Sequence, residues 1–268
     1  MATRNSLTQK QSFPAFIKSE GVMSGLTKTL GSEIKKSEFV SAVISAVQTN
    51  GKLQDCDFNS IINVALLGQS LKLAHSPQLG QYYMVPYKGK AQFQLGYKGY
   101  IQLAIRTGAY EKLNVIAIKE GELIKYNPLD EEIEVNLIED EEIRDSTPTI
   151  GYYAMFKYNK EHGGLKKAMY WSKNKMEKHA RKYSKAYDSF WGKDFDSMAY
   201  KTMLRQLISK WGTMSIDFQK AYTSDMGVIQ DNGEVEYVDS PTFETKEVVE
   251  EVIPNEDIPE TFEQETLL

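Results

Sequence analysis

The sequence has little cysteine and histidine and contains no long apolar run. One of its 268 residues is cysteine, Cys56, and three are histidine. A lone cysteine excludes an internal disulfide and fits a reducing compartment; the thiol is either a nucleophile or an incidental buried group. No stretch of about 18 uncharged apolar residues occurs, so no transmembrane span is expected. The first ten residues are polar and lack the apolar core of an export signal, so we expect a cytoplasmic protein.

Recognisable catalytic motifs are also missing. The sequence contains no Gly-x4-Gly-Lys-[Ser/Thr] loop and no Gly-x-Ser-x-Gly elbow, and its histidines lie far apart, at His75, His162 and His179. Two acidic groups could bind Mg²⁺ as in a nuclease: residues 140–142, and the pair Asp194 and Asp196. The first group fits a solvated charge run equally well, and the second fits a helix start. We therefore expect no catalytic site and no required cofactor, with Mg²⁺ at most a modulator.

Charge divides the chain into two unlike parts. Residues 229–268 hold thirteen Asp/Glu and one Lys, a net charge of −12, whereas residues 1–228 carry +7. Within that body, residues 157–210 carry fourteen Lys/Arg and five Asp/Glu, a net of +9. A basic, aromatic-rich segment joined to an acidic tail indicates a protein that binds a polyanion. The tail either regulates that binding and recruits partners, or only improves solubility.

Hydrophobic periodicity predicts helices followed by hairpins. Helices are expected at residues 14–30, from Ser37 to Asn50, and at 57–74. The runs 82–87 and 91–95 predict a hairpin with a basic tip, Lys88-Gly89-Lys90, and Pro86 places its strand at an edge or bulge. Later segments predict a short helix at 100–106, strands at 113–118 and 133–137, a hairpin at 149–158 and 165–171, and helices at 173–185, 197–211 and 216–223.

This order of elements predicts an α+β fold: a small antiparallel β-sheet with hairpins, backed by helices. We expect a helical N-terminal region at residues 1–75, an α+β DNA-binding core at 76–228 and a disordered acidic tail at 229–268. The apolar N-terminal helices either mediate self-association or pack onto their own core.

Cations recur at helical spacing, which predicts rows of phosphate contacts. One row is Lys98 and Arg106 beside Tyr97; a second comprises Lys178, Arg181, Lys182 and Lys185; a third pairs Lys201 with Arg205. Near the third row lie Trp191, which is either a stacking platform or a lid on the core, and Lys193. With Lys88 and Lys90 these residues are the candidate DNA contacts. We expect cations from separate segments, Lys98, Arg106, Lys201 and Arg205 among them, to converge in one groove that follows a sugar-phosphate backbone.

Several ordered motifs resemble the RecT family of phage single-strand annealing proteins. They are Leu66-x-Gly-x-Ser-x-x-Leu73, Gly80-x-x-Tyr83-x-Val85-Pro86-Tyr87, Leu95-Gly96-Tyr97-Lys98-Gly99-Tyr100-Ile101-x-Leu103-Ala104-x-Arg106-x-Gly108, and Trp191 followed by Met198-Ala199-x-Lys201-Thr202-x-x-Arg205. Tyr97, Lys98, Arg106, Lys201 and Arg205 stand within these motifs, so the resemblance also implies a place in the DNA groove for them. Some family members carry Arg at the position of Lys98, and Gln206 stands where a second Arg often follows Arg205.

The resemblance implies an ATP-independent recombinase of the bacterial host cytoplasm. Such a protein coats single-stranded DNA as a ring or helical filament, pairs complementary strands into duplex, and works beside a phage 5′–3′ exonuclease. A host single-strand binding protein is a further expected partner. From the residues alone two other functions stay open: a metal-dependent nuclease using Asp194 and Asp196, and a scaffold that binds an acidic protein surface.

Overall fold

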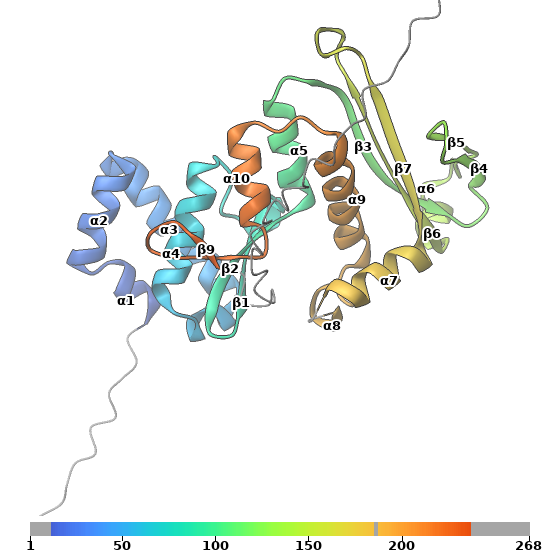
Figure 1. Cartoon of the computed structure of the whole chain (residues 1–268). Helices are drawn as coiled ribbons and strands as arrows, with labels where there is room; N and C mark the ends of the chain where they lie inside the picture. The colour runs from blue at the N-terminus through green and yellow to red at the C-terminus, as the bar shows by residue number, and fades with distance from the viewer. Residues whose placement is uncertain (1–11, 185–186, 237–268) are drawn as a thin grey trace, which may run out of the picture. The chain divides into compact units, whose positions relative to one another are not determined.

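The computed structural model describes residues 12–184 and 187–236, with the backbone alone at Ser189 and Phe190 (Figure 1). The N-terminal half contains α1 (Phe13–Ile17), α2 (Glu20–Leu30), α3 (Glu33–Thr49), the 3-10 helix η1 (Gly51–Asp55), α4 (Phe58–Ser70), η2 (Pro77–Leu79), β1 (Tyr82–Tyr87), β2 (Lys90–Leu95) and α5 (Tyr97–Arg106). The remainder contains β3 (Tyr110–Lys119), β4 (Leu123–Asn127), β5 (Glu132–Val135), α6 (Glu141–Ser146), β6 (Thr149–Tyr158), η3 (Lys160–His162), β7 (Lys166–Ser172), α7 (Lys173–Tyr183), α8 (Tyr187–Phe190), α9 (Phe195–Trp211), α10 (Ile216–Ser224), β8 (Val228–Ile229) and β9 (Val235–Glu236).

The N-terminal helices begin and end at small polar residues or glycine. The predicted helix at 14–30 is two helices, because Ser19 takes an extended conformation between them, and Gly31 ends the second in the left-handed region. α3 begins at Glu33, earlier than predicted, after the extended Ser32. Phe13 and Ile17 of α1 are fully buried in the core. These two side chains therefore pack onto the chain itself and are not available for self-association.

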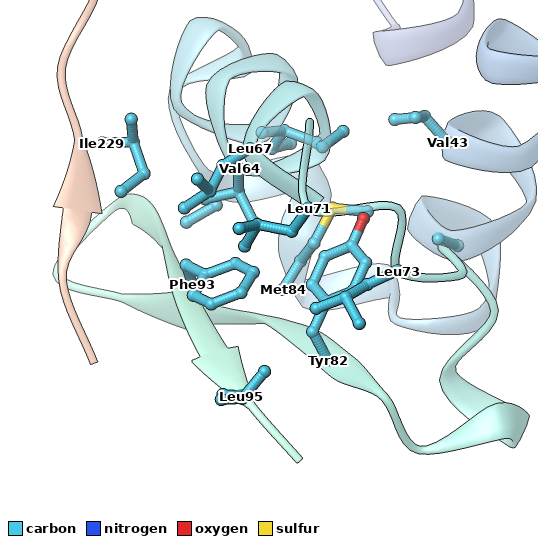
Figure 2. Close-up of a cluster of buried hydrophobic side chains, with 14 of the residues drawn as sticks. Val43, Val64, Leu67, Leu71, Leu73, Tyr82, Met84, Phe93, Leu95 and Ile229 are labelled. Atoms are coloured by element: carbon cyan, nitrogen blue, oxygen red, sulfur yellow. The ribbon is translucent and has the colours of Figure 1, made fainter. Parts of the chain in front are cut away.

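The β1–β2 hairpin packs on α4 and closes with the predicted basic turn. Lys88 and Gly89 both have positive φ, +45° and +77°, as a two-residue hairpin turn requires. In Figure 2 Tyr82 and Phe93 from the two strands lie against Leu71 and Val64 of the α4 region, and Ile229 closes the other side. Pro86 lies on β1, the edge strand, since β2 is bridged on its far side to Gly227.

A second, three-stranded antiparallel sheet has the order β3-β6-β7, with β6 in the centre. α7 and α9 pack on one face, where Tyr152, Phe156 and Met203 are buried. The β4–β5 hairpin covers part of the other face, against Tyr153, Met155 and Ala168. β4 and α6 lie at residues 120–147, where we predicted only the strand at 133–137. The α+β class and the antiparallel hairpins are confirmed.

One apolar core joins α1–α4 to β1–β2, α5, α9 and α10, so it extends across residue 75. Residues 229–236 also belong to the fold, because β8 pairs with β9 and the side-chain amide of Asn63 donates to the carbonyl of Ile229. The predicted tail therefore begins later than residue 229, and its remaining residues, 237–268, lie outside the described part. Among the described helices, none is long and apolar enough to cross a membrane.

Candidate nucleic-acid interface

An aromatic cleft separates the β1–β2 hairpin from the start of α9. We call it the tyrosine cleft; it has a volume of about 340 Å³, and its lining includes Tyr82, Tyr83, Tyr97, Lys193, Asp194, Met198 and Lys201. Tyr83 is 39% exposed. Burial raises the pKa of Tyr83, and the charge of Asp194 and the neighbouring Tyr97 add to the shift. The cleft thus offers an accessible aromatic ring with the exposed Lys193 at the same opening.

Glycines let the chain approach itself closely beside this cleft. A Cβ at Gly96 would lie 2.1 Å from the carbonyl oxygen of Gly80, and one at Gly99 would lie 2.1 Å from that of Gln81. Side chains at either position would push α5 away from the segment before β1. The two glycines therefore let α5 and β1 come close enough for Tyr97 and Tyr83 to line the same cleft. Tyr83 was not among our candidates, although it stands within the Gly80-x-x-Tyr83 motif.

A buried ion cluster forms around Asp225, where Lys201, which also lines the tyrosine cleft, meets Arg205. The fully buried Asp225 carboxylate accepts from Lys201 Nζ at 2.9 Å and from Arg205 Nη1 at 2.8 Å. It also accepts from the backbone N–H of Leu95 at 2.9 Å and from the Tyr100 hydroxyl at 3.3 Å. Burial lowers the pKa of Lys201, and Asp225 opposes this shift. The cluster ties α5, α9 and β2 to the segment that follows α10.

The prediction that Lys201 contacts phosphate directly is therefore wrong for this conformation, because its ammonium group is buried and paired. Arg205 differs, since about a third of its side chain is exposed. Besides its ion pair with Asp225, its guanidinium lies over the Tyr222 ring at 4.1 Å and donates to the Tyr100 hydroxyl at 3.0 Å. Arg205 is thus held in one orientation, and one edge of its guanidinium remains accessible to solvent.

That open edge lines a second cleft, which we call the arginine cleft. It has a volume of about 300 Å³ and lies between α7 and α9, with a lining that includes His179, Tyr183, Trp191, Met198, Lys201, Arg205 and Asp225. Met198 and Lys201 line both clefts, which therefore meet at α9. Trp191 is 4% exposed and packs in the core beneath, so its role as a stacking platform is not supported.

α7 places a cationic stripe along the arginine cleft. Arg181 pairs with Glu177 at 2.8 Å and lies over the Tyr187 ring, and Lys182 lies over Tyr183. Lys178 is exposed and has no ion pair within the described residues. Burial lowers the pKa of His179, and the charges of Lys182 and Lys175 lower it further. Lys175 and Lys182 thus lie close enough to the cleft to act on His179, one of its lining residues. Lys185 lies outside the described residues.

Arg106 and Lys98, the candidate cations near α5, differ in their surroundings. Arg106 donates to the carbonyl oxygens of Leu71 and Lys72, each at 2.6 Å, and so completes the C-terminal end of α4. Lys98 is exposed on α5, and its ammonium lies over the Tyr97 ring, 6.0 Å from the ring centroid, at the tyrosine cleft. The predicted convergence therefore fails for Arg106, whereas Lys201 and Arg205 meet at Asp225 and Lys98 lies beside the cleft that Lys201 also lines.

The hairpin tip and the acidic pair have structural partners. Lys88 lies over the Tyr87 ring, and Lys90 pairs with Glu236 of β9 at 3.2 Å. Asp194 caps α9 through the backbone N–H of Ser197, and Asp196 accepts from the Tyr152 hydroxyl at 2.5 Å. Within the described residues no group of three or more His, Cys, Asp or Glu side chains could hold a metal ion.

Comparison with known proteins identifies the family. The model of the RecT family matches residues 37–239. The uncharacterized protein YqaK of Bacillus subtilis (strain 168) is 43% identical over 213 residues, which cover 80% of this chain and 72% of YqaK. Protein RecT of Escherichia coli (strain K12) is 27% identical over 237 residues, which cover 81% of this chain and 85% of that protein. The matched region contains both clefts and the whole Asp225 cluster, and the chain belongs to the RecT family.

Proposed function

We propose that this protein binds single-stranded DNA and pairs complementary strands without ATP, as a self-associating protein in phage recombination. The observation that carries the proposal is the pair of adjoining clefts along α9. One contains the exposed Tyr83 ring, and the other contains the open edge of Arg205 beside the cationic α7. Membership of the RecT family supports the same function.

The clefts supply the two interactions that bind a single strand without reading its sequence. Cations neutralise phosphates and release counterions, and a tyrosine ring stacks on a base with a contribution of about 1–3 kcal/mol. A strand gripped on its phosphate side leaves its Watson–Crick edges free for a second strand. Base pairing then supplies the specificity, and the protein lowers the repulsion between strands and raises their local concentration.

The proposal also covers what drives strand pairing and which partners the protein binds. The sequence has no P-loop, which favours pairing driven by hybridisation alone. We expect the protein to bind both the single strand and the annealed duplex, in the bacterial host cytoplasm, beside a phage 5′–3′ exonuclease and a host single-strand binding protein. Mg²⁺ would modulate annealing by screening phosphates.

Two fluorophore-labelled complementary oligonucleotides test the proposal. We expect the protein to accelerate their pairing without nucleotide and to leave both strand lengths unchanged in the presence of Mg²⁺. Shortened strands would support a nuclease instead, and an unchanged pairing rate would refute annealing. Tyr83→Leu should weaken single-strand binding about threefold or more. The control is Trp211→Leu at the end of α9, an aromatic residue that is 52% exposed and lines neither cleft.

A further inference from the structure

A row of three lysines crosses the three-stranded sheet. Lys112 on β3 pairs in register with Lys157 on β6, and Lys157 pairs with Lys166 on β7. Phe156 and Tyr158, the neighbours of Lys157, are buried on the α9 side, so the row points to the opposite face. Like charges directly opposite on adjacent strands are destabilising. The row therefore indicates a surface that gains from an anionic partner.

The chain itself satisfies little of this positive charge. Lys157 pairs with Glu111 at 2.9 Å. Lys112 and Lys166 are exposed, and neither has an ion pair within the described residues. The β4–β5 hairpin covers this face over Met155 and Ala168, which stand two residues from Lys157 and Lys166. At β7 Glu131 accepts from Lys167 Nζ at 3.0 Å and from the backbone N–H of Ala168 at 3.1 Å, so the cover ends beside the lysine row.

The segment that covers the rest of the face has the opposite charge. Residues 120–147, which we call the acidic lobe, hold eleven Asp/Glu and two Lys/Arg, a net charge of −9. On β5 Ile133 and Val135 pack on the sheet, whereas the alternate residues Glu132 and Glu134 are exposed. Exposed apolar side chains accompany these carboxylates, and Leu129 at the hairpin tip is 91% exposed.

The lobe is firmly attached to its own subunit. The fully buried Glu122 accepts from Arg144 Nε at 2.6 Å, and Arg144 Nη2 donates to the carbonyl oxygen of Ala117 on β3 at 2.8 Å. The lobe connects residue 119 to residue 149, the pair of positions at one end of the sheet, whereas the lysine row lies near the other end. One molecule therefore carries an acidic, partly apolar lobe and, beyond the edge of that lobe, an uncovered basic strip on the same sheet face.

We infer that the lysine row binds the acidic lobe of a second copy of this chain. The lobe of the second copy covers the part of the sheet face that the lobe of the first copy leaves exposed, with Glu132 and Glu134 facing Lys112 and Lys166. Such a contact joins two different surfaces, so it repeats head to tail and builds an open filament or a ring. The inference deepens the self-association that is part of the proposed function.

A second copy fits this surface better than the DNA strand of the proposed clefts. Both clefts lie along α9, which packs on the opposite face of the sheet from the lysine row. The exposed Leu129 and Ile143 of the lobe also suit a protein partner, because phosphates do not bury apolar side chains. Direct binding of DNA to the row is thus an alternative outcome of the test.

Two charge-reversed variants of the full chain provide that test. The first is Lys112→Glu/Lys166→Glu, and the second is Glu132→Lys/Glu134→Lys. Sedimentation velocity, without DNA and with oligo(dT), should show association weakened about tenfold or more for each variant alone, because like charges then meet at the contact. An equimolar mixture should associate again, since each variant's lobe is complementary to the other variant's row.

Controls with matched charge changes lie on other elements. Lys210→Glu/Lys220→Glu and Glu20→Lys/Glu38→Lys change exposed residues of α9, α10, α2 and α3, and should associate as the unmodified chain does. The inference is overturned if either test variant associates normally, if the mixture does not restore association, or if the unmodified chain is monomeric in both conditions. Loss of DNA binding by the first variant with unchanged association would assign the row to DNA. Strand pairing is measured separately, so annealing by a monomer would refute this contact and leave the proposed function standing.

Discussion

The buried Asp225 cluster predicts a large and specific loss of stability. Asp225→Asn removes the negative charge that faces Lys201 and Arg205 and leaves a buried ammonium without a counterion. Breaking a buried ion pair from one side costs about 3–5 kcal/mol. For a fold of this size that corresponds to a melting temperature lower by about 6–20 °C. Urea unfolding and calorimetry of the full chain measure both quantities.

A double-mutant cycle separates the pair from the surrounding packing. Lys201→Met removes the ammonium and keeps most of the apolar stem, so Lys201→Met/Asp225→Asn should be more stable than the sum of the single changes predicts, by about 1 kcal/mol or more. Strict additivity, or a loss below about 1 kcal/mol for Asp225→Asn, would refute the reasoning. The same geometry means that replacing Lys201 and Arg205 together by alanine perturbs folding as well as DNA binding.

The pH dependence of Asp225→Asn gives an independent check. Burial already lowers the pKa of Lys201, and loss of Asp225 should lower it further. Between the folded and unfolded pKa values the unfolded chain binds more protons, so the free energy of unfolding rises with pH. The deficit of the variant should therefore shrink as pH rises toward the ordinary lysine range. A deficit that is constant with pH would contradict a charged Lys201 as its cause.

Four further predictions follow from single contacts. Burial lowers the pKa of His75 to about 4, so the free energy of unfolding should fall by roughly 2–3 kcal/mol from pH 7 to pH 4.5, and His75→Gln should flatten that dependence in urea titrations. Arg106→Ala should lower the free energy of unfolding by about 1.5–3 kcal/mol and leave the DNA affinity, measured by anisotropy, nearly unchanged. Lys98→Ala should weaken DNA binding and leave the free energy of unfolding nearly unchanged. Equal changes in stability and affinity for the two variants would contradict these contacts. Lys175→Gln/Lys178→Gln/Lys182→Gln should reduce the slope of log affinity against log salt by about 2, and an unchanged slope would remove α7 from the interface. Deletion of residues 237–268, a net charge of −9, should leave single-strand binding unchanged or tighter, and a collapse of binding would exclude a competing role for the tail.

Local patterns in the sequence predicted most elements of the fold. The Lys88-Gly89 turn, the Asp57 and Asp194 helix caps and the apolar strand at 149–158 depend on neighbouring residues, so they could be predicted without the tertiary structure. The break between α1 and α2 and the strand β4 were missed. The polar segment at 120–147 is ordered because Ile133 and Val135 pack on the face of the three-stranded sheet. This contact joins residues that are distant in the sequence, so local patterns do not predict it.

The candidate site depended far more on tertiary contacts. Helical spacing alone cannot distinguish a cation that meets solvent from one that meets a buried carboxylate elsewhere in the chain. Lys201 and Lys178 look alike in sequence, yet one faces Asp225 and the other faces water. Asp225 itself stands in no recognisable pattern, and Arg106 finds its partners 34 and 35 residues away.

The sequence by itself determined the α+β class, the helix and hairpin order, the charge asymmetry and the resemblance to the RecT family, because these depend on residue type and local spacing. Only the tertiary structure decided which cations remain accessible, because desolvation and pairing depend on residues brought together from α5, α9 and the segment after α10. It also decided that Tyr83 opens into a cleft while Trp191 is buried in the core.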